Sequence, residues 1–563
     1  MKTRAALILM AALLLVCGCV KQVQVTPAAT VAPTVDDPNA SATHSMLPDI
    51  ETENAEISQS GIYSRLGDGP LDELATSKDY GLLLPYAAVA VNGDYGGIWI
   101  QKYGLVTVGG VIVTDGIYDI VERAYTYSAD RTEPKPAYLL VTYEPDSEDQ
   151  QDPEKRCAAC AIDGSWVTPF DYASIWFSEN VIVLTRKFWT LDIDIYNYNG
   201  TFLYNMLDTK WAKGIAPGEK FNLRGYGTIG GRDYAHIRMG DGNIAFINLQ
   251  TGECRETEFV DAGDIGNEGL VAVAIWNESG YRQLWGYINA KFEIAIPLQY
   301  EYALPFINGF AVVAQWMSSL YEELVIDANG DALLLAENGN ILRNVDGTGF
   351  KVFDYDKGTS EFYTNEFARI MPQSKYGERV GGYSIEGGWY VGDCYEKSRR
   401  NIGGEASGAM SDDRYIGKLL FSETEEYLYQ GVSNISQVIG NYVIYATADA
   451  DQESSQGVMT LDGRDIIPLE KNVYITAATD GDSATAFMVN SIYYVYGMYD
   501  KSDTTFPPFY KLIRTDGTVL ASGSGALSYN DTADMYAVIT QKTYSYVDRN
   551  GDVKIRIPLE FIG

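Results

Sequence analysis

The sequence predicts an all-β protein built from repeated β-hairpins that follow an exported leader. The chain of 563 residues contains 42 Tyr and 55 Gly, which favour strands and tight turns respectively. Long windows rich in Ala, Leu, Glu and Lys, which would indicate helices, are scarce. Short apolar strands also recur on either side of Asp-Gly or Asn-Gly pairs. These pairs supply the positive φ angles that tight hairpins require.

The clearest copy of the repeat lies between Leu284 and Val313. It comprises Leu284-Trp285-Gly286-Tyr287-Ile288-Asn289, then Ile294-Ala295-Ile296-Pro297, Tyr300, Pro305-Phe306 and Gly309-Phe310-Ala311-Val312-Val313. This pattern resembles the WG repeat, which is named for its Trp-Gly pair. Phe292 stands where the repeat ordinarily has a turn glycine. The resemblance is close over residues 284–313, weak over most of 80–563 and poorest over 340–456.

Degenerate copies have the same order of elements: a strand, a turn with glycine and a second strand. They are Tyr103 to Tyr118 through Gly109-Gly110, Ala161 to Tyr172 through Asp163-Gly164, Val458 to Tyr474 through Asp462-Gly463, Leu512 to Leu520 through Asp516-Gly517, and Tyr546 to Pro558 through Asn550-Gly551. Their uneven spacing predicts loop insertions on a common unit.

One hairpin cannot bury its apolar face in water, so neighbouring units must stack into a propeller or a solenoid. The resemblance to WG repeats implies a β-propeller-like array, which we assign to residues 60–563. We expect the last strand, Val553 to Pro558, to complete the first blade and close one large ring. Two packed propellers divided within 340–456 are the alternative.

The first residues predict export and a lipid anchor. Lys2 and Arg4 precede an apolar run from Ala5 to Cys17, as in a secretory signal. Leu15-Val16-Cys17-Gly18-Cys19 resembles the lipobox of bacterial lipoproteins, which predicts a signal peptide at 1–18 and lipidation of Cys19. Attached acyl chains would hold the protein on the extracytoplasmic face of a bacterial cell membrane. The alternative is an ordinary signal peptide.

Residues 19–59 are rich in Thr, Ala, Pro and Val and show no apolar period. We interpret them as a flexible tether between the lipid and the repeat domain; the alternative is an ordered first strand.

The formal net charge of −34 limits the possible partners. Removal of Lys2 and Arg4 with the leader would bring it to −36. So acidic a chain repels nucleic acid phosphates and anionic lipid headgroups. We therefore expect a monomer that binds no nucleic acid.

The cysteines and histidines predict no catalytic, cofactor or metal site. Cys157 and Cys160 match C-x-x-C but lie on an expected strand, which would point their sulfurs to opposite faces. The chain has two histidines: His44 in the tether and His236 in a strand-like segment. Histidine-based metal clusters and Ser-His-Asp catalysis are thereby disfavoured.

Two further motifs have structural interpretations. Gly225 to Gly230 matches G-x-G-x-x-G, but strand-like residues follow it instead of the helix that phosphate binding requires. Asp327 to Asp331 and Asp548 to Asp552 share D-x-N-G-D. We assign both to hairpin turns and keep calcium binding as the alternative, because later acidic ligands are missing.

The sequence therefore favours a membrane-anchored binding or scaffold module that displays a repeat domain to a protein, peptide or glycan. The alternative is a lipid-anchored glycoside hydrolase or similar hydrolase with two carboxylates, but no motif selects a pair among 76 acids. Aromatic side chains such as Trp285, Tyr287, Tyr300 and Phe306 could stack on sugars. We expect most of them to pack in the core.

Overall fold

The computed structural model describes most of the chain from Tyr63 onward. The described residues are 63–66, 78–92, 98–127, 132–143, 155–214, 221, 223–266, 268–317, 320–344, 347, 349–356, 359–370, 382–385, 388–396, 414–448, 454–481, 483–491 and 509–562. Cys19, the predicted signal peptide and the predicted tether lie outside these residues. No described helix is long and apolar enough to cross a membrane.

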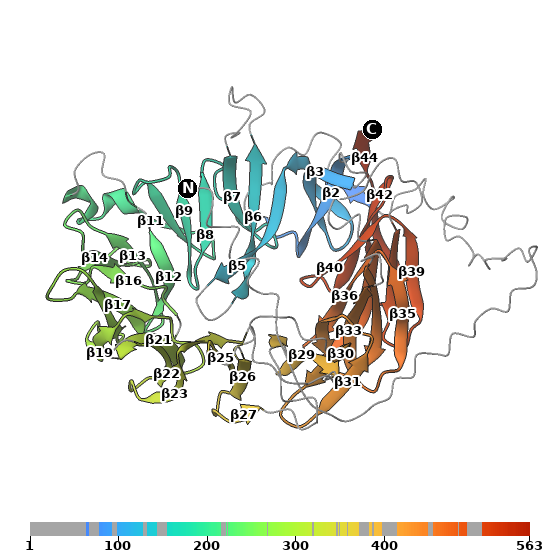
Figure 1. Ribbon diagram of the computed structural model, residues 1–563. Coiled ribbons are helices and arrows are strands. Elements are labelled where there is room, and N and C mark those ends of the chain that lie inside the picture. Colours follow the sequence, from blue (N-terminus) through green and yellow to red (C-terminus); the bar gives the residue numbers. More distant parts are fainter. Residues whose placement is uncertain are drawn as a thin grey trace, which may run out of the picture.

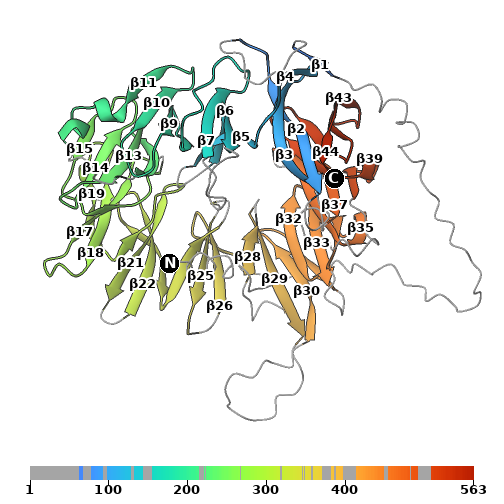
Figure 2. The same ribbon diagram turned by 90° about the horizontal axis from the view of Figure 1, so that it is seen from above.

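Eleven β-sheets follow one another along the described chain, and we number them as blades 1 to 11. Nine sheets have four strands, blade 1 has five and blade 2 has three. Figures 1 and 2 show the sheets arranged around a ring, with the first and last blades side by side.

The strands of blades 1 to 5 are as follows. Blade 1 contains β1 (Ser64–Arg65), β2 (Leu83–Asn92), β3 (Ile98–Thr107), β4 (Val111–Tyr118) and β44 (Glu560–Ile562); blade 2 contains β5 (Ile120–Tyr127), β6 (Thr132–Tyr143) and β7 (Lys155–Ala161); blade 3 contains β8 (Ser174–Phe177), β9 (Val181–Thr185), β10 (Ile193–Asn197) and β11 (Phe202–Asn205); blade 4 contains β12 (Arg224–Ile229), β13 (Arg232–Arg238), β14 (Ile244–Asn248) and β15 (Cys254–Glu256); blade 5 contains β16 (Asp261–Ala262), β17 (Val271–Trp276), β18 (Gln283–Ile288) and β19 (Ile294–Tyr300).

The strands of blades 6 to 11 complete the ring. Blade 6 contains β20 (Tyr302–Ala303), β21 (Phe310–Met317), β22 (Leu320–Asp327) and β23 (Ala332–Glu337); blade 7 contains β24 (Gly339–Arg343), β25 (Gly349–Asp354), β26 (Thr359–Thr364) and β27 (Arg369–Ile370); blade 8 contains β28 (Gly382–Ile385), β29 (Trp389–Glu396), β30 (Arg414–Phe421) and β31 (Glu426–Gln430); blade 9 contains β32 (Asn434–Ile439), β33 (Tyr442–Ala448), β34 (Ser454–Thr460) and β35 (Asp465–Lys471); blade 10 contains β36 (Val473–Asp480), β37 (Ser483–Ser491), β38 (Phe509–Arg514) and β39 (Val519–Ser524); blade 11 contains β40 (Ala526–Asn530), β41 (Met535–Ile539), β42 (Thr543–Val547) and β43 (Val553–Pro558). Two short 3-10 helices, η1 (Met206–Asp208) and η2 (Ala212–Gly214), follow blade 3.

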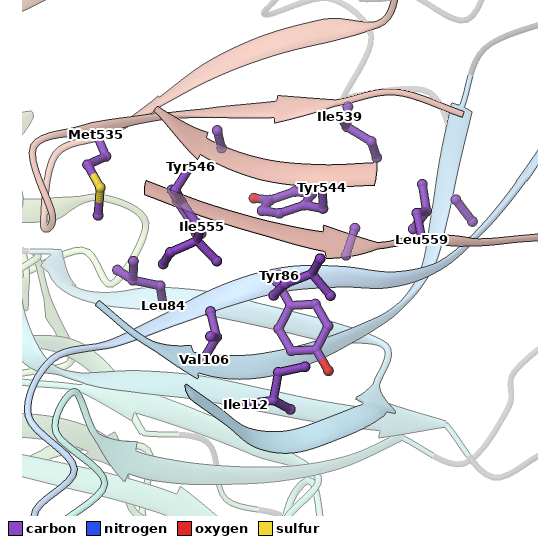
Figure 3. Packing of buried hydrophobic residues seen from close by; sticks show 14 of the residues in the cluster. Leu84, Tyr86, Val106, Ile112, Met535, Ile539, Tyr544, Tyr546, Ile555 and Leu559 are labelled. Atoms are coloured by element: carbon purple, nitrogen blue, oxygen red, sulfur yellow. The ribbon is translucent and has the colours of Figure 1, made fainter. Parts of the chain in front are cut away.

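Hydrophobic clusters join every blade to the next. Eleven clusters lie one at each interface between neighbours, including the interface between blade 11 and blade 1. Figure 3 shows the last of these interfaces, where Tyr546 and Ile555 of blade 11 pack against Leu84 and Val106 of blade 1. Burial of apolar surface at each interface therefore stabilises a closed ring. The prediction of an all-β, propeller-like fold is confirmed.

The ring is continuous through residues 340–456, where a division between two propellers was the alternative. Strands β25 to β33 lie in this stretch and belong to blades 7, 8 and 9. Separate clusters join blade 7 to blade 8 and blade 8 to blade 9.

Both ends of the described chain join blade 1. The terminal strand β44 runs parallel to β2 and pairs with Val89 to Val91. Strand β1 adds to the opposite edge, parallel to β4. The expectation that Val553 to Pro558 would complete the first blade was wrong. Those residues form β43, the fourth strand of blade 11, and the chain enters blade 1 at Glu560, two residues after Pro558.

The Trp-Gly repeat is offset from the blades. Its first half, β18 and β19, is the outer half of blade 5, and its second half, β20 and β21, is the inner half of blade 6. Tyr287 links the halves, because its hydroxyl donates to the Leu304 carbonyl oxygen at 2.7 Å. One repeat thus carries the contact between two blades.

The glycine of the Trp-Gly pair permits a close approach of two strands. A Cβ atom on Gly286 would lie 2.5 Å from the Ile296 carbonyl oxygen and 2.6 Å from that of Pro297. The pairing of β18 with β19 is irregular at this point. Glycine is therefore required here by space, since a side chain would collide with backbone atoms.

Blade 2 departs from the predicted hairpin after Asp163-Gly164. Val167 and Tyr172 make only isolated bridges, to Cys160 and Cys157 respectively. Between these two bridges, the four residues 168–171 lie opposite the two residues 158–159 of β7, so the segment bulges away from β7. Pro169, which has no N–H to donate, lies inside the bulge.

Candidate binding face

The two faces of the ring carry different kinds of connection. Successive strands of a blade are antiparallel, apart from β1 and β44, which are added in parallel to the edges of blade 1. The second-to-third connections and the links between blades therefore lie on one face, which we call the loop face. The first-to-second and third-to-fourth turns lie on the opposite face, the turn face. Third-to-fourth turns outside blade 2 contain three to five residues, whereas second-to-third connections contain two to seventeen. Variation is therefore concentrated on the loop face.

Side chains close the tight turns of the turn face. In the turn from Asp327 to Asp331, Asp327 Oδ1 accepts hydrogen bonds from the backbone N–H groups of Asn329 and Asp331, at 2.8 and 2.9 Å. These bonds hold the pKa of Asp327 below its usual value. Asp548 accepts the same pair of bonds from Asn550 and Asp552. Both D-x-N-G-D motifs thus lie in hairpin turns, and their first carboxylates are occupied by the backbone.

An aromatic residue replaces glycine at one of these turns. Phe292 has φ of 65°, a left-handed conformation that is unfavourable for a bulky side chain. Its ring packs edge-on against Phe246 and Tyr234 of blade 4, and the Arg255 guanidinium lies 4.5 Å from the ring centroid. Contacts with the neighbouring blade therefore compensate for the backbone strain.

On the loop face, blade 3 presents two adjacent exposed aromatic side chains. Phe188 and Trp189 lie in the connection between β9 and β10 and are 58% and 57% exposed. Trp189 also has φ of 64°. Core packing does not explain why a strained backbone should carry an exposed aromatic ring. The loop formed by residues 186–192 is therefore the leading candidate for ligand contact.

Hydrogen bonds within the loop fix its shape. The Thr190 hydroxyl donates to the Lys187 carbonyl oxygen at 2.8 Å, and the Arg186 N–H donates to the Asp192 carbonyl oxygen at 3.0 Å. Phe221 N–H, from the link to blade 4, donates to the Trp189 carbonyl oxygen at 3.2 Å. The exposed rings are thus carried on a backbone held from both sides.

An ion network anchors the base of the loop. Arg186 contacts the carboxylates of Asp171, Asp192 and Asp194, and its guanidinium lies 4.7 Å from the Tyr172 ring centroid. Burial opposes its charge, but the hydrogen bond to Asp194 and the nearby negative charges hold the pKa of Arg186 above its usual value. This single arginine fixes the ends of the loop and accounts for the close approach of three carboxylates.

Asn205 connects the same network to the link that follows blade 3. Its side-chain amide donates to Asp192 Oδ1 at 3.0 Å and to Asp194 Oδ1 at 2.7 Å. Its own Oδ1 accepts from Leu207 N–H at the start of η1. Leu207 is exposed, so an exposed apolar side chain lies two positions after Asn205, which is bonded to the base of the loop.

Other exposed aromatic residues also lie at loop-face connections. Trp276 and Tyr281 flank the turn between β17 and β18 and are 51% and 89% exposed. Tyr355 follows β25 and is also exposed. The loop face therefore combines variable connections with exposed aromatic groups.

The candidate residues that the sequence suggested outside the loop face have structural roles. Cys157 and Cys160 are free and buried, and they belong to clusters on opposite faces of β7. Burial raises the pKa of the Cys160 thiol to about 12, which disfavours the reactive thiolate. The prediction that the two sulfurs point to opposite faces is confirmed.

His236 lies in β13 and packs edge-on against Phe246. Burial lowers its pKa to about 4, so the ring is neutral at neutral pH. Gly225 accommodates this ring, because a Cβ there would lie 2.4 Å from His236 Nε2. The G-x-G-x-x-G match, which the sequence suggested to be a glycine-rich loop between strands, instead forms most of β12 and the turn after it, and the strand β13 follows.

The aromatic residues of the Trp-Gly repeat pack in the core. Tyr287, Tyr300 and Phe306 are buried in the cluster between blades 5 and 6, and Trp285 packs against it. The described part of the chain contains no group of three or more His, Cys, Asp or Glu side chains that could hold a metal ion. The calcium alternative thus has no assembled ligand set among those residues.

These features define a β-propeller whose candidate binding surface is its loop face. Residues 285–315 match the family model described as "WG containing repeat". The chain therefore contains a WG repeat, as its Trp-Gly pattern indicated. No curated protein matches the chain.

The chain is also similar to solved structures at low identity. A eukaryotic initiation factor is 9% identical, with 79% of this chain and 96% of that chain covered and a TM-score of 0.35. The β-propeller domain of the Trilobed protease from Pyrococcus furiosus is 10% identical over 52% of this chain and 95% of its own, with a TM-score of 0.23. Dipeptidyl peptidase 4 from Porphyromonas gingivalis is 12% identical over 76% and 67%, with a TM-score of 0.29.

Sequence reasoning missed Phe188 and Trp189. A signal was present, because two adjacent large aromatic residues in a β protein cannot both face the same side of a strand. Their position between Arg186-Lys187 and Asp192 also breaks the apolar alternation of the flanking strands. The Arg186 network was not readable, since Asp171 and Asn205 meet it only through the folding of blade 3.

Proposed function

We propose that this protein is a membrane-anchored extracytoplasmic binding module that presents the loop face of its propeller to a ligand. The observation that carries this proposal is the difference between the two faces. One has short turns closed by their own side chains, and the other has variable connections and exposed aromatic residues. Rigid scaffolds with variable loops are well suited to binding.

The path of the chain into the ring supports display. Ser64 N–H bonds to the Gly110 carbonyl oxygen at 2.8 Å, and Gly110 lies in the turn between β3 and β4 on the turn face. The chain that leads from the predicted lipid at Cys19 therefore enters on the turn face, at the outer edge of blade 1. The loop face lies on the side away from this entry point.

The anchor is tested by Cys19→Ser, because removal of the acceptor sulfur should release the protein from membranes without changing its fold. The measurement is the membrane-bound fraction after a salt wash, together with the circular dichroism spectrum of the released protein. A variant that remains bound after the wash would contradict the anchor.

The binding face is tested by matched substitutions on the two faces. One variant combines Trp276→Ala, Tyr281→Ala and Tyr355→Ala on the loop face, and the control combines Lys291→Ala, Asn329→Ala and Asp552→Ala on the turn face. Saturable binding of the purified chain to arrays of glycans, peptides and envelope proteins should weaken at least tenfold with the first variant only. Equal weakening by the turn-face variant would contradict the proposal. So would hydrolytic turnover of an array component that a single Asp or Glu substitution abolishes.

A further inference from the structure

We propose that Phe188 and Trp189 form a stacking platform for pyranose rings of a neutral polysaccharide. This inference rests on the proposed function and names a ligand class for one part of the loop face. The two side chains are adjacent in the chain, more than half exposed, and located at the tip of loop 186–192.

Rigidity favours these rings as ligand contacts. The Thr190 hydroxyl, the Arg186 network and the Phe221 N–H hold the backbone of the loop. Trp189 is kept in a left-handed conformation, which an unconstrained tryptophan would leave. A ring fixed before binding loses little conformational freedom when the ligand arrives, so more of the contact energy remains as affinity.

The chemistry of the platform suits a sugar. The face of an aromatic ring carries partial negative charge and attracts polarised C–H bonds, which line the apolar face of a pyranose. Lys187 is exposed and directly precedes the aromatic pair, and Asp192 closes the same loop at its other end. An ammonium and a carboxylate provide the donors and acceptors that hydroxyl groups require.

Local charge distinguishes the platform from the rest of the molecule. Among the described residues, four cationic side chains lie in the loop or in the link after blade 3, and four carboxylates lie in the loop, in the Arg186 network or in the same link; they are Arg186, Lys187, Lys210 and Lys213, and Asp171, Asp192, Asp194 and Asp208. The sequence of the link also contains Glu219 and Lys220, whose formal charges offset each other. The formal charges of all these side chains cancel, although the whole chain carries −34. A locally neutral surface on an acidic protein matches an uncharged polymer, whereas a polyanion would meet long-range repulsion.

The small size of the platform disfavours a protein partner, and the charged side chains around it disfavour insertion into a membrane. A stable protein interface covers about 800 Å² on each side, whereas Phe188, Trp189 and Leu207 are the large exposed apolar side chains among the described residues of the loop and of the link after blade 3. Insertion of the loop into a bilayer would bring Lys187 and Asp192 toward hydrocarbon, which is unfavourable for charged side chains. One or two sugar rings fit a platform of two aromatic side chains.

The test is affinity electrophoresis of the purified chain through gels that contain a neutral β-linked glucan or an N-acetylglucosamine polymer. We expect retardation of the wild type by at least one such polymer. Trp189→Ala should weaken the apparent affinity at least tenfold, and Trp189→Phe should retain most of it. Phe202→Ala is the matched control, because it removes an exposed aromatic side chain from the turn-face end of the same blade, and it should change the affinity less than twofold.

A second variant separates loss of the ring from loss of the loop. Trp189→Gly preserves the left-handed backbone and removes the side chain, so it should fold with an unchanged Tm and still lose retardation. Retained retardation in this folded variant would overturn the proposal. Absence of wild-type retardation on every neutral polymer tested would also overturn it.

Sedimentation with phosphatidylcholine and phosphatidylglycerol vesicles tests the lipid alternative, using the Cys19→Ser chain. Vesicle binding that Trp189→Ala abolishes would reassign the platform to membranes and overturn the sugar proposal. The array experiment separates this failure from that of the proposed function. If the triple loop-face variant loses ligand binding while Trp189→Ala binds normally, the binding module stands and the stacking platform does not.

Discussion

The Tyr546 hydroxyl donates a hydrogen bond to the Pro85 carbonyl oxygen at 2.5 Å, across 461 positions of sequence and between the last blade and the first. The ring of Tyr546 is fully buried in the cluster that both blades share. This contact repeats a pattern used elsewhere in the propeller. Tyr138 bonds to Leu83 O, Tyr287 to Leu304 O and Tyr429 to Leu461 O, each across a blade interface.

Tyr546→Phe should destabilise the ring at its closure. Removal of the hydroxyl leaves the Pro85 carbonyl oxygen without this buried donor, and a loss of about 1–3 kcal/mol in the free energy of unfolding is expected. The measurement is urea denaturation followed by tyrosine and tryptophan fluorescence. Tyr281→Phe, at an exposed site, is the control and should change stability by less than about 0.5 kcal/mol. Equal midpoints for the wild type and Tyr546→Phe would contradict the assigned role.

Gly286→Ala should be strongly destabilising. The added methyl group would meet the Ile296 and Pro297 carbonyl oxygens at 2.5 and 2.6 Å, and backbone atoms cannot move aside as a flexible side chain can. We expect a loss of about 2–3 kcal/mol. Gly109→Ala is the control, since a Cβ there meets only the Thr107 hydroxyl oxygen at 3.7 Å. Thermal denaturation of the two variants compares them, and similar Tm values would show that the close approach is not required.

His236 should make stability depend on pH in the acidic range. Its pKa is about 4 in the folded protein because of burial, below the usual 6.5, so the unfolded chain binds more protons between these values. The contribution is therefore fully present above pH 6.5 and is lost as the pH falls to 4, by about 3 kcal/mol in total. Proton NMR can follow this directly, because the chain has two histidines. A His236 resonance that titrates near pH 6.5 would refute the burial argument.

Asp327→Ala should weaken its hairpin turn without any dependence on calcium. The variant loses the acceptor for the N–H groups of Asn329 and Asp331, which should lower stability by about 1 kcal/mol. Asp331→Ala is the control, because the Asp331 side chain is exposed on the same turn and the bond that it shares with Asp327 is made by its backbone. Calorimetry with and without calcium measures both effects. A calcium-dependent rise in Tm that Asp327→Ala removes would favour a calcium site at this turn.

The strand and turn pattern of this protein was readable because it is local. The Asp-Gly and Asn-Gly turns at Gly463, Gly517 and Gly551 adopt positive φ, as the residue types require. Tyr287 was expected in the core from its strand position, and Phe306 is buried as well, although it lies between β20 and β21 instead of in a strand. Blade 2 was the exception, since Pro169 converts an expected strand into a bulge.

Particular residues show where local reasoning ended. The expected closing strand, Val553 to Pro558, has the right composition but pairs with β42, because the chain continues far enough for β44 to reach β2. Phe292 was recognised as an unusual turn residue, but its compensating contacts with Phe246 and Arg255 come from another blade. The loop at Trp189 owes its shape partly to Asp171 and Asn205. These residues lie outside the loop, and no regular spacing in the sequence relates them to it.

The sequence by itself determined the strands, the tight turns and the stacking of Trp-Gly-type units, because these depend on residues within a few positions of one another. It also carries the predicted lipid signal at Cys19, which is a linear motif. The tertiary structure decided the number of blades, the closure of the ring through β44 and Tyr546, and the difference between its faces. These features depend on side chains that meet only when distant blades pack. Such contacts produce no periodic pattern in the sequence from which they could be predicted.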